Sequence, residues 1–314
     1  MSQKVSVIVP IFNEQDNISA LMGAINKVFE PLSYEHEIIF IDDGSKDATL
    51  SVIKAIMQYD KHVQYLSFSR NFGHQSALKA GIDKAQGDCI ISMDGDMQHP
   101  PELIPALLKK WEEGFDIVYT IRKEDNNISY SKRKTSNLFY SVLSYLSDIE
   151  IEKGTADFRL INRQVAEIIR ELDKSEQFLR GIIKWVGFNQ ASIEYEPAER
   201  FRGKSKYTPK KMIRLALEGI TSFSIKPLYF ATYIGIGFSL LSLLYLPYAL
   251  YSYYFGHAIS GWTSVIVTIA FFGGLQLMIL GILGLYLGKL FMVSKGRPSY
   301  IIKETSLPKE IERH

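Results

Sequence analysis

Two carboxylates separated by one residue follow a short apolar run, in Asp94-Gly95-Asp96, and Gln98 comes two positions later. Carboxylate and amide oxygens suit hard divalent cations, and Mg²⁺ or Mn²⁺ is commonly held by few carboxylates together with substrate phosphates. A metal ion bound here would bridge a diphosphate and stabilise negative charge on a leaving group. Asp94, Asp96 and Gln98 are therefore candidate metal ligands, whereas we expect His99, which precedes a proline, to orient the loop.

Three other polar segments follow short apolar runs, at residues 10–14, 42–47 and 69–73. Each alone matches ordinary turn chemistry, in which Asp, Asn, Gly and Ser are common. If the apolar runs are parallel strands, their carboxyl ends meet at one edge of the sheet, where ligands bind. We therefore expect one shared crevice, with plain turns as the alternative. A dinucleotide or P-loop site is not supported, because neither glycine-rich fingerprint is present.

Apolar runs alternate with helical patterns along the N-terminal part of the chain. The runs that predict strands are 4–11, 37–41, 63–68, 89–93 and 116–120, and the patterns that predict helices are 17–29, 48–59, 75–85 and 101–113. Such alternation is typical of an α/β domain with a mostly parallel, doubly wound sheet.

The chain has 314 residues, 36 Lys plus Arg against 34 Asp plus Glu, a net charge of +2 and one Cys. The near-neutral balance argues against a nucleic-acid partner, and a single Cys excludes an intrachain disulfide and a multi-cysteine zinc site. The charges are unevenly distributed, because no Asp, Glu, Lys or Arg occurs between Lys226 and Lys289. We therefore expect a soluble domain followed by a membrane domain.

The uncharged run is too long for one spanning helix of about 20 residues and too short for three with loops. We expect a two-helix hairpin over 227–290, with spans near 228–254 and 264–290. Lys and Arg flank the hairpin but are absent from its loop, so the positive-inside rule places the soluble domain, both termini and a tail of residues 291–314 in the cytoplasm. A buried helical hairpin of a soluble protein is the alternative.

Residues 208–226 predict a separate amphipathic helix. Pro209 is suited to a helix start, and apolar side chains recur on one face beside Lys210, Lys211 and Arg214. We expect this helix to lie in the headgroup region just before the first span. Packing on the soluble domain is the alternative.

Five segments in order, 8–14, 41–45, 69–74, 93–100 and 156–160, resemble the motifs of family 2 glycosyltransferases. The most similar branch is the polyprenyl-phosphate glycosyltransferases, which include dolichyl-phosphate mannose synthase and bacterial bactoprenol glucosyltransferases. The resemblance covers the whole chain and implies a GT-A fold for residues 1–207. One departure is Gly95-Asp96-Met97, where relatives often carry Ala or Leu, but both carboxylates and Gln98 are retained.

The resemblance implies inverting transfer of one sugar from a nucleotide-sugar to polyprenyl (undecaprenyl) phosphate, with Mg²⁺ or Mn²⁺ as cofactor. We expect glucose from a UDP donor; N-acetylhexosamine, mannose, aminoarabinose and a GDP donor are alternatives. The donor-binding residues carried over are Pro10, Asn13, Glu14, Asp42, Asp43, Arg70, Lys79 and Asp94. Asp42 is the expected base or ribose contact, and Arg70 and Lys79 are expected near the donor phosphates. Lys79 has the alternative of a solvated helix residue, and Ser45 and Asp47 are expected to cap the following helix.

The acceptor phosphate requires cations at the membrane side of the crevice. The candidates are Arg122, Arg133, Lys134, Ser136, Arg200, Arg202, Lys204, Ser205 and Lys206. Arginine forks suit phosphate oxygens, although the run at 200–206 also fits a positive cluster that holds lipid headgroups.

Asp96 and Asp157 are the expected catalytic residues. The resemblance implies that Asp157 is the catalytic base. However, the second pKa of a phosphate monoester is about 6, so the acceptor is already largely dianionic near neutral pH. Asp157 therefore orients the acceptor, accepts a residual proton or contacts a sugar hydroxyl, and we expect its loss to cost less activity than the loss of Asp96.

Two other functions remain as alternatives. A processive polysaccharide synthase is disfavoured, because 177–181 lacks the Trp of a Gln-x-x-Arg-Trp signature and two spans cannot readily enclose a polymer. A non-catalytic membrane scaffold would have lost the metal carboxylates. The expected setting is the cytoplasmic membrane, with a flippase and an envelope glycosyltransferase acting downstream. Small residues such as Gly284 and Gly288 permit a homo-oligomer or close packing within the hairpin.

Overall fold

The computed structural model describes residues 3–123, 154–172, 179–196, 220–221, 224–255 and 261–308. Eight strands form one sheet in the order β7-β5-β6-β4-β1-β2-β3-β8. The strands are β1 (Lys4–Ile11), β2 (Glu35–Asp42), β3 (Val63–Phe68), β4 (Cys89–Ser92), β5 (Ile117–Arg122), β6 (Thr155–Asn162), β7 (Gln190–Tyr195) and β8 (Ile302–Thr305). The central strands β4, β1, β2 and β3 pair in parallel, which confirms the α/β architecture expected from the sequence.

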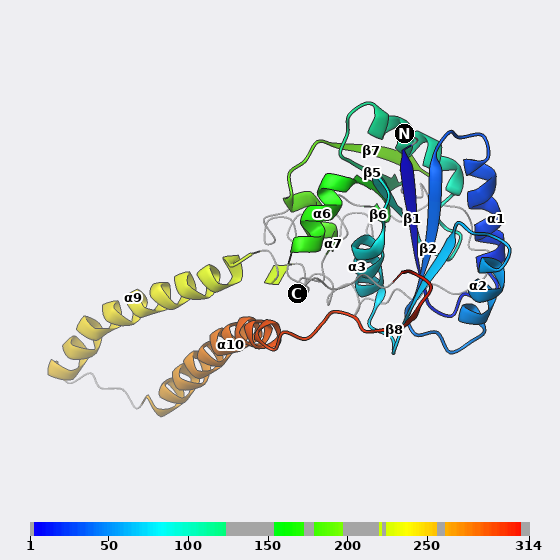
Figure 1. The fold of residues 1–314 in the computed structure, drawn as a ribbon. Coiled ribbons are helices and arrows are strands. Elements are labelled where there is room, and N and C mark those ends of the chain that lie inside the picture. The colour runs from blue at the N-terminus through cyan, green and yellow to red at the C-terminus, as the bar shows by residue number, and fades with distance from the viewer. Residues whose placement is uncertain are drawn as a thin grey trace.

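Helices cover both faces of the sheet (Figure 1). On one face lie α1 (Ile18–Phe29), α2 (Thr49–Met57) and the short helix η1 (Pro101–Leu103) that leads into α4 (Ile104–Glu112). On the other lie α3 (His74–Lys84), α6 (Arg163–Glu171) and α7 (Leu179–Trp185). The strands are apolar on both sides because both faces are covered, and this is the reason for their continuous apolar runs.

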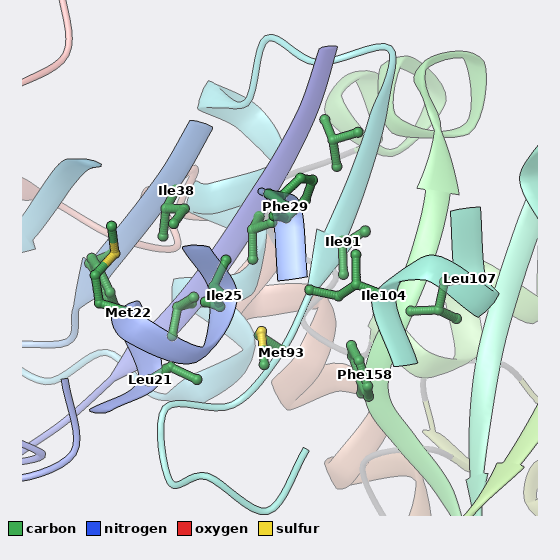
Figure 2. Packing of buried hydrophobic residues seen from close by; sticks show 14 of the residues in the cluster. Leu21, Met22, Ile25, Phe29, Ile38, Ile91, Met93, Ile104, Leu107 and Phe158 are labelled. Atoms are coloured by element: carbon green, nitrogen blue, oxygen red, sulfur yellow. The ribbon is translucent and has the colours of Figure 1, made fainter. Parts of the chain in front are cut away.

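Two buried clusters hold these layers together. Figure 2 shows side chains of α1 and α4, among them Ile25 and Leu107, packing with Ile91, Met93 and Phe158. Successive residues of β1 serve opposite faces, because Val7 belongs to this cluster and Ile8 to the one beneath α3. The core therefore fixes where each strand ends, and the strand ends carry the polar loops.

Strand β6 was not predicted, and its direction differs from that of its neighbours. It lies between β4 and β5 and runs antiparallel to both. The charged side chains of Asp157 and Arg159 interrupt its apolar pattern, so the segment does not resemble a buried strand in sequence. Both are nevertheless buried, because they pair with each other at 2.9 Å.

Part of the expected C-terminal tail, residues 291–314, belongs to the sheet instead. Residues Ile302–Thr305 form β8, which pairs antiparallel with β3 at its outer edge. Just before it, the Tyr300 ring stacks on Phe68 with centroids 5.2 Å apart, and the Tyr300 hydroxyl donates to Asp83 Oδ2 at 2.8 Å. The chain thus returns to the α/β domain after its long apolar segment.

The two expected spans are helices. They are α9 (Lys226–Tyr254) and α10 (Trp262–Ser294), and they extend away from the α/β domain (Figure 1). Within the described part of the chain, Phe271–Ser294 of α10 is long and apolar enough to cross a membrane, and none of its side chains is buried. The amphipathic helix expected at 208–226 falls almost entirely outside the described residues.

Candidate functional site

The loops after β1 and β2 are joined by side chain to backbone hydrogen bonds. The Asn13 backbone N–H donates to Ser45 Oγ, and the Lys46 N–H donates to Asn13 Oδ1, each at 2.9 Å. Asn13 has a φ of 54°, a left-handed conformation that asparagine tolerates better than most residues. Asp47 Oδ1 accepts from the Thr49 N–H at the start of α2, as expected, whereas Ser45 binds the neighbouring loop instead.

Asp42 and Asp43 are adjacent and buried but have different partners. Asp42 accepts from the Ser45 N–H at 2.9 Å and from Ser67 Oγ at 2.8 Å. Asp43 accepts from the Phe72 N–H at 2.6 Å and from the Gly73 N–H at 2.9 Å. Burial raises the pKa of Asp43, although the hydrogen bonds from these two amides oppose the shift. Both carboxylates therefore brace the loops around the crevice.

The loop that carries Asp94 and Asp96 folds back on the end of β1. A Cβ at Gly95 would lie 2.5 Å from Ile11 Cγ2, so any other residue there requires Ile11 to shift, and Met97 has a left-handed φ of 62°. His99 Nδ1 accepts from the Asp94 N–H at 2.9 Å, which confirms that His99 orients the loop. Its ring is buried and stacks on Phe158 at 5.3 Å.

Asp157 lies on β6, at the register where β4 ends. Its side chain is 4% exposed. Arg159 Nη2 donates to Asp157 Oδ1 at 2.9 Å, and His74 Nε2 lies 3.2 Å from Asp157 Oδ2. The antiparallel pairing of β6 with β4 thus brings a carboxylate from far along the chain to the loop with Asp94.

His74 was not assigned a role from the sequence, yet it links the two halves of the site. It is the first residue of α3, and its Nε2 is 3.4 Å from Asp94 Oδ1 as well as 3.2 Å from Asp157. The available signal was its position directly after Gly73, at the carboxyl end of β3, together with its place inside one of the five motifs.

Tyr195 was also missed. It ends β7, where it pairs with Arg122 of β5, and it is buried against His99 and Phe158. Burial raises the pKa of its phenol, Arg122 opposes the rise, and Asp94 and Asp96 add to it. Its phenol therefore stays neutral beside the carboxylate loop. The same interactions place Arg122 on this side of the site.

The residues around Asp94 fit a divalent cation. Asp94 Oδ1 is buried and makes no hydrogen bond. Because buried polar atoms are usually hydrogen-bonded, this oxygen is a candidate to bind a metal ion. Asp96 Oδ1 accepts from the Gln98 N–H at 3.1 Å, so the second carboxylate is held close by in the same loop. Within the described residues, no group of three or more His, Cys, Asp or Glu is arranged to hold a metal ion alone. Such a site would be completed by substrate phosphates.

Three of the predicted donor residues lie at or near the carboxyl ends of β1 and β3. Pro10 is buried in β1, opposite Ile41. Glu14 Oε2 accepts from Asn17 Nδ2 at 2.6 Å. Arg70 is exposed on the loop after β3, with its guanidinium 4.0 Å above the Phe72 ring.

The structure does not bring Lys79 to the site, and it is not a solvated residue either. It is buried, and its Nζ pairs with Asp83 Oδ1 at 2.5 Å, one turn along α3. Asp83 in turn accepts from Tyr300. The positive charge is thus neutralised within α3, because a buried ammonium requires a close carboxylate.

The remaining predicted acceptor residues, Arg133, Lys134, Ser136, Arg200, Arg202, Lys204, Ser205 and Lys206, lie outside the described residues. Of that predicted group, Arg122 is the member whose surroundings the structure describes.

Comparison with known proteins agrees with this geometry. The model of the family described as "Glycosyl transferase family 2" matches residues 6–169, which include the two acidic turns, His74 and Asp157. The bactoprenol glucosyl transferase of Shigella phage SfV is 44% identical over 96% of this chain and 98% of its own length. A prophage bactoprenol glucosyl transferase homolog of Escherichia coli is 43% identical with the same coverage, and an uncharacterized glycosyltransferase of Bacillus subtilis is 40% identical over 96% of this chain and 93% of its own. With its motifs placed at one edge of the sheet and relatives matched along nearly the full length, the chain belongs to glycosyl transferase family 2.

Proposed function

We propose that this protein transfers a single glucose from UDP-glucose to a polyprenyl phosphate at a membrane surface, with inversion and with the aid of Mg²⁺ or Mn²⁺. The observation that carries the proposal is the grouping of Asp94, His74 and Asp157 at the carboxyl end of the sheet, with one Asp94 oxygen left without a hydrogen bond. The similarity to proteins named bactoprenol glucosyl transferases supports the choice of sugar and acceptor.

On the donor side, Asp94, Asp96 and Gln98 would hold the metal ion. When bound, the metal supplies positive charge to the diphosphate that leaves. The joined loops of Asn13 and Ser45 form the adjacent wall, where a nucleoside fits. Because hydrogen bonds join these loops, the donor would meet residues that are already held in place.

On the acceptor side, Asp157 acts mainly as a positioning group. Both of its oxygens already face donors, Arg159 on one side and His74 on the other. An acceptor phosphate is largely dianionic near neutral pH and needs alignment for in-line attack on the anomeric carbon more than deprotonation. Arg122 is the described cation on this side of the site that best fits the phosphate.

The long helices α9 and α10 would anchor the domain as a membrane hairpin. Among the residues that the structure describes, Phe271–Ser294 is the segment that meets the length and hydropathy of a span. However, β8 follows α10 and pairs with β3, which precedes α9, so both strands lie on the same side of the membrane. An even number of crossings satisfies this pairing and a single crossing does not. This argument supports two spans. The Lys and Arg residues that flank the hairpin favour a catalytic domain on the cytoplasmic side of the cytoplasmic membrane.

A transfer assay with the full-length protein in nanodiscs tests the proposal. The mixture contains undecaprenyl phosphate, Mn²⁺ or Mg²⁺, and one of a panel of radiolabelled UDP- and GDP-sugars. We expect label from UDP-glucose to enter the lipid phase, and to be lost with a chelator or with Asp96→Ala. The matched control is Asp88→Asn, whose carboxylate accepts from the Lys4 N–H at the opposite end of the sheet and should leave transfer unchanged.

The outcomes separate the parts of the proposal. Transfer of another sugar would replace glucose but keep the reaction. Donor binding without transfer would rule out this acceptor, and no donor binding at all would rule out the enzyme.

A further inference from the structure

His74 contacts both Asp94 and Asp157, and the scheme above gives it no role of its own in the transfer step. Its Nε2 is 3.2 Å from Asp157 Oδ2 and 3.4 Å from Asp94 Oδ1. The first contact is a hydrogen bond, and the second is a longer electrostatic contact. A single nitrogen therefore lies between the carboxylate on the acceptor side and a candidate ligand of the donor-side metal.

The position of His74 is fixed by the backbone before it. Asp43 accepts hydrogen bonds from the N–H groups of Phe72 and Gly73, the two residues that lead into α3. Gly73 has a φ of 101°, which turns the chain into the helix. The Asp43 carboxylate thus positions His74, whose side chain contacts Asp94 and Asp157.

Asp157 is held from two directions. Arg159 on the same strand holds Oδ1 and is itself tied to the Ala156 carbonyl at 2.9 Å. His74 holds Oδ2 from a different element, so loss of the imidazole removes one of the contacts that set the plane of the carboxylate.

We infer that His74 is a positioning residue, which orients the Asp157 carboxylate relative to Asp94 and so aligns the acceptor with the donor for transfer. This inference rests on the proposed function. It assigns His74 to the transfer step rather than to donor binding, since a hydrogen bond joins it to Asp157. A misplacement of about 1 Å at a reacting centre can cost on the order of 100-fold in rate.

The same geometry separates this role from a structural one. The His74 side chain is 41% exposed, and its ion-pair contacts at such a site add little to folding stability. Loss of the imidazole should therefore slow transfer while leaving the fold and the binding of UDP with Mn²⁺ nearly unchanged.

The test compares His74→Leu, which has no donor, with His74→Gln, whose amide nitrogen can replace Nε2. The matched control is His62→Gln, because His62 Nδ1 also contacts a carboxylate, Asp60 at 2.8 Å, on the part of the chain that leads into β3. In nanodiscs with undecaprenyl phosphate, we expect His74→Leu to lower kcat about 5- to 10-fold, which is no more than the loss expected on removing the Asp157 carboxylate itself. We expect His74→Gln to recover most of that loss and His62→Gln to match the wild type.

Two readouts besides activity accompany the assay. Calorimetry with UDP and Mn²⁺ should give affinities for His74→Leu within about 2-fold of the wild type, and thermal unfolding should shift by no more than about 2 °C. Wild-type kcat in His74→Leu would overturn the inference and leave the proposed function intact. So would an equal loss of UDP affinity, or a loss that His74→Gln fails to recover. If the wild type itself transfers no sugar, the result contradicts both the proposed function and the inference about His74.

Discussion

Asp94 and Asp157 have different roles, although both carboxylates lie at the same edge of the sheet. Asp94 keeps one oxygen without a hydrogen bond, whereas Asp157 has both oxygens engaged by Arg159 and His74. An oxygen without a hydrogen bond suits a metal ion, and an oxygen held by a hydrogen bond suits alignment.

The two carboxylates should therefore differ in how much activity their loss removes. We expect Asp94→Asn to lower transfer by at least about 100-fold and Asp157→Asn by about 10-fold, because charge stabilisation on the leaving group outweighs alignment of a preformed dianion. Transfer rates at saturating UDP-glucose measure the difference. An equal or larger loss with Asp157→Asn would indicate that proton removal from the acceptor limits the rate.

Lys79 provides a second comparison, because its predicted donor contact and its observed partner imply different results. In the structure it pairs with Asp83, whose side chain is 13% exposed. We expect Lys79→Met to lower the free energy of unfolding by about 3 kcal/mol, since a largely buried carboxylate loses its cation, and to leave UDP affinity unchanged. Chemical unfolding and calorimetry check both quantities. A tenfold weaker UDP affinity with unchanged stability would restore the donor role.

His36 is the third residue with a measurable consequence. Its ring is stacked between Phe29 and His62, with centroids 4.4 Å away on each side, and its buried Nε2 makes no hydrogen bond. Burial lowers its pKa below the ordinary 6.5, repulsion from His62 adds to the shift, and Asp60 opposes it. His36 therefore binds a proton at about pH 6.5 in the unfolded chain, but only at a lower pH in the folded chain.

The sign of the resulting pH dependence follows. Stability from this group is complete above pH 6.5 and falls as the pH decreases toward the folded-state pKa, because the unfolded state binds more protons there. We expect His36→Phe, which keeps the ring stack, to reduce the loss of stability between pH 7.5 and 5.5. Thermal unfolding at several pH values in that range measures it. Parallel curves for the wild type and the variant would show that the pKa of His36 is the same in the folded and the unfolded protein.

Part of the site was predictable from residue type and spacing alone. Asp94, Asp96 and Gln98 lie in one short loop, so their proximity needs no knowledge of the fold. His74, Arg159 and Tyr195 were missed because their roles depend on strand pairing: β6 brings Asp157 to the site, and β7 brings Tyr195. These three residues lie at a helix start, in a strand interior and at a strand end, and such positions do not by themselves indicate a function.

At the scale of elements, the parallel strands β1 to β4 were predicted closely, because each is buried on both faces and reads as an apolar run. Strand β8 was not, since Ile302–Thr305 is short, is largely polar and follows a membrane segment. It forms only because β3 offers an unpaired edge, and this partner lies more than 200 residues earlier in the chain.

Tyr300 should show how firmly this strand is attached. We expect Tyr300→Phe to lower the free energy of unfolding by about 1 kcal/mol through loss of the hydrogen bond to Asp83. Tyr300→Ala also removes the stack on Phe68 and should cost about 3 kcal/mol. Chemical unfolding measures both, and hydrogen exchange of the β3 amides locates the effect. Equal losses for the two variants would mean that the ring stack contributes little.

At the scale of the whole molecule, the α/β domain is connected to the membrane helices from both sides. One connection precedes α9, and the other is the segment from α10 to β8, which is fixed to β3 by the Tyr65 N–H to Ser306 Oγ bond at 2.8 Å. The domain should therefore be incomplete without the chain that follows its membrane helices.

Truncation tests this dependence. We expect a chain ending at residue 225 to unfold about 5–10 °C below one in which residues 298–308 are joined back through a flexible linker in place of the two helices, because the first lacks the edge strand. Thermal unfolding of the two soluble proteins measures the difference. Equal midpoints would show that β8 adds no stability.

The pairing of β3 with β8 also sets an order of events during synthesis. Chains are made from the N-terminus, so β3 leaves the ribosome long before β8 exists, and its outer edge stays open while α9 and α10 are being made. β8 can pair with this edge only after the chain has returned to the side of the membrane on which β3 lies. A newly made protein that has inserted its helices wrongly therefore keeps an exposed strand edge, which is the feature that aggregation and quality-control proteases recognise in unfinished folds.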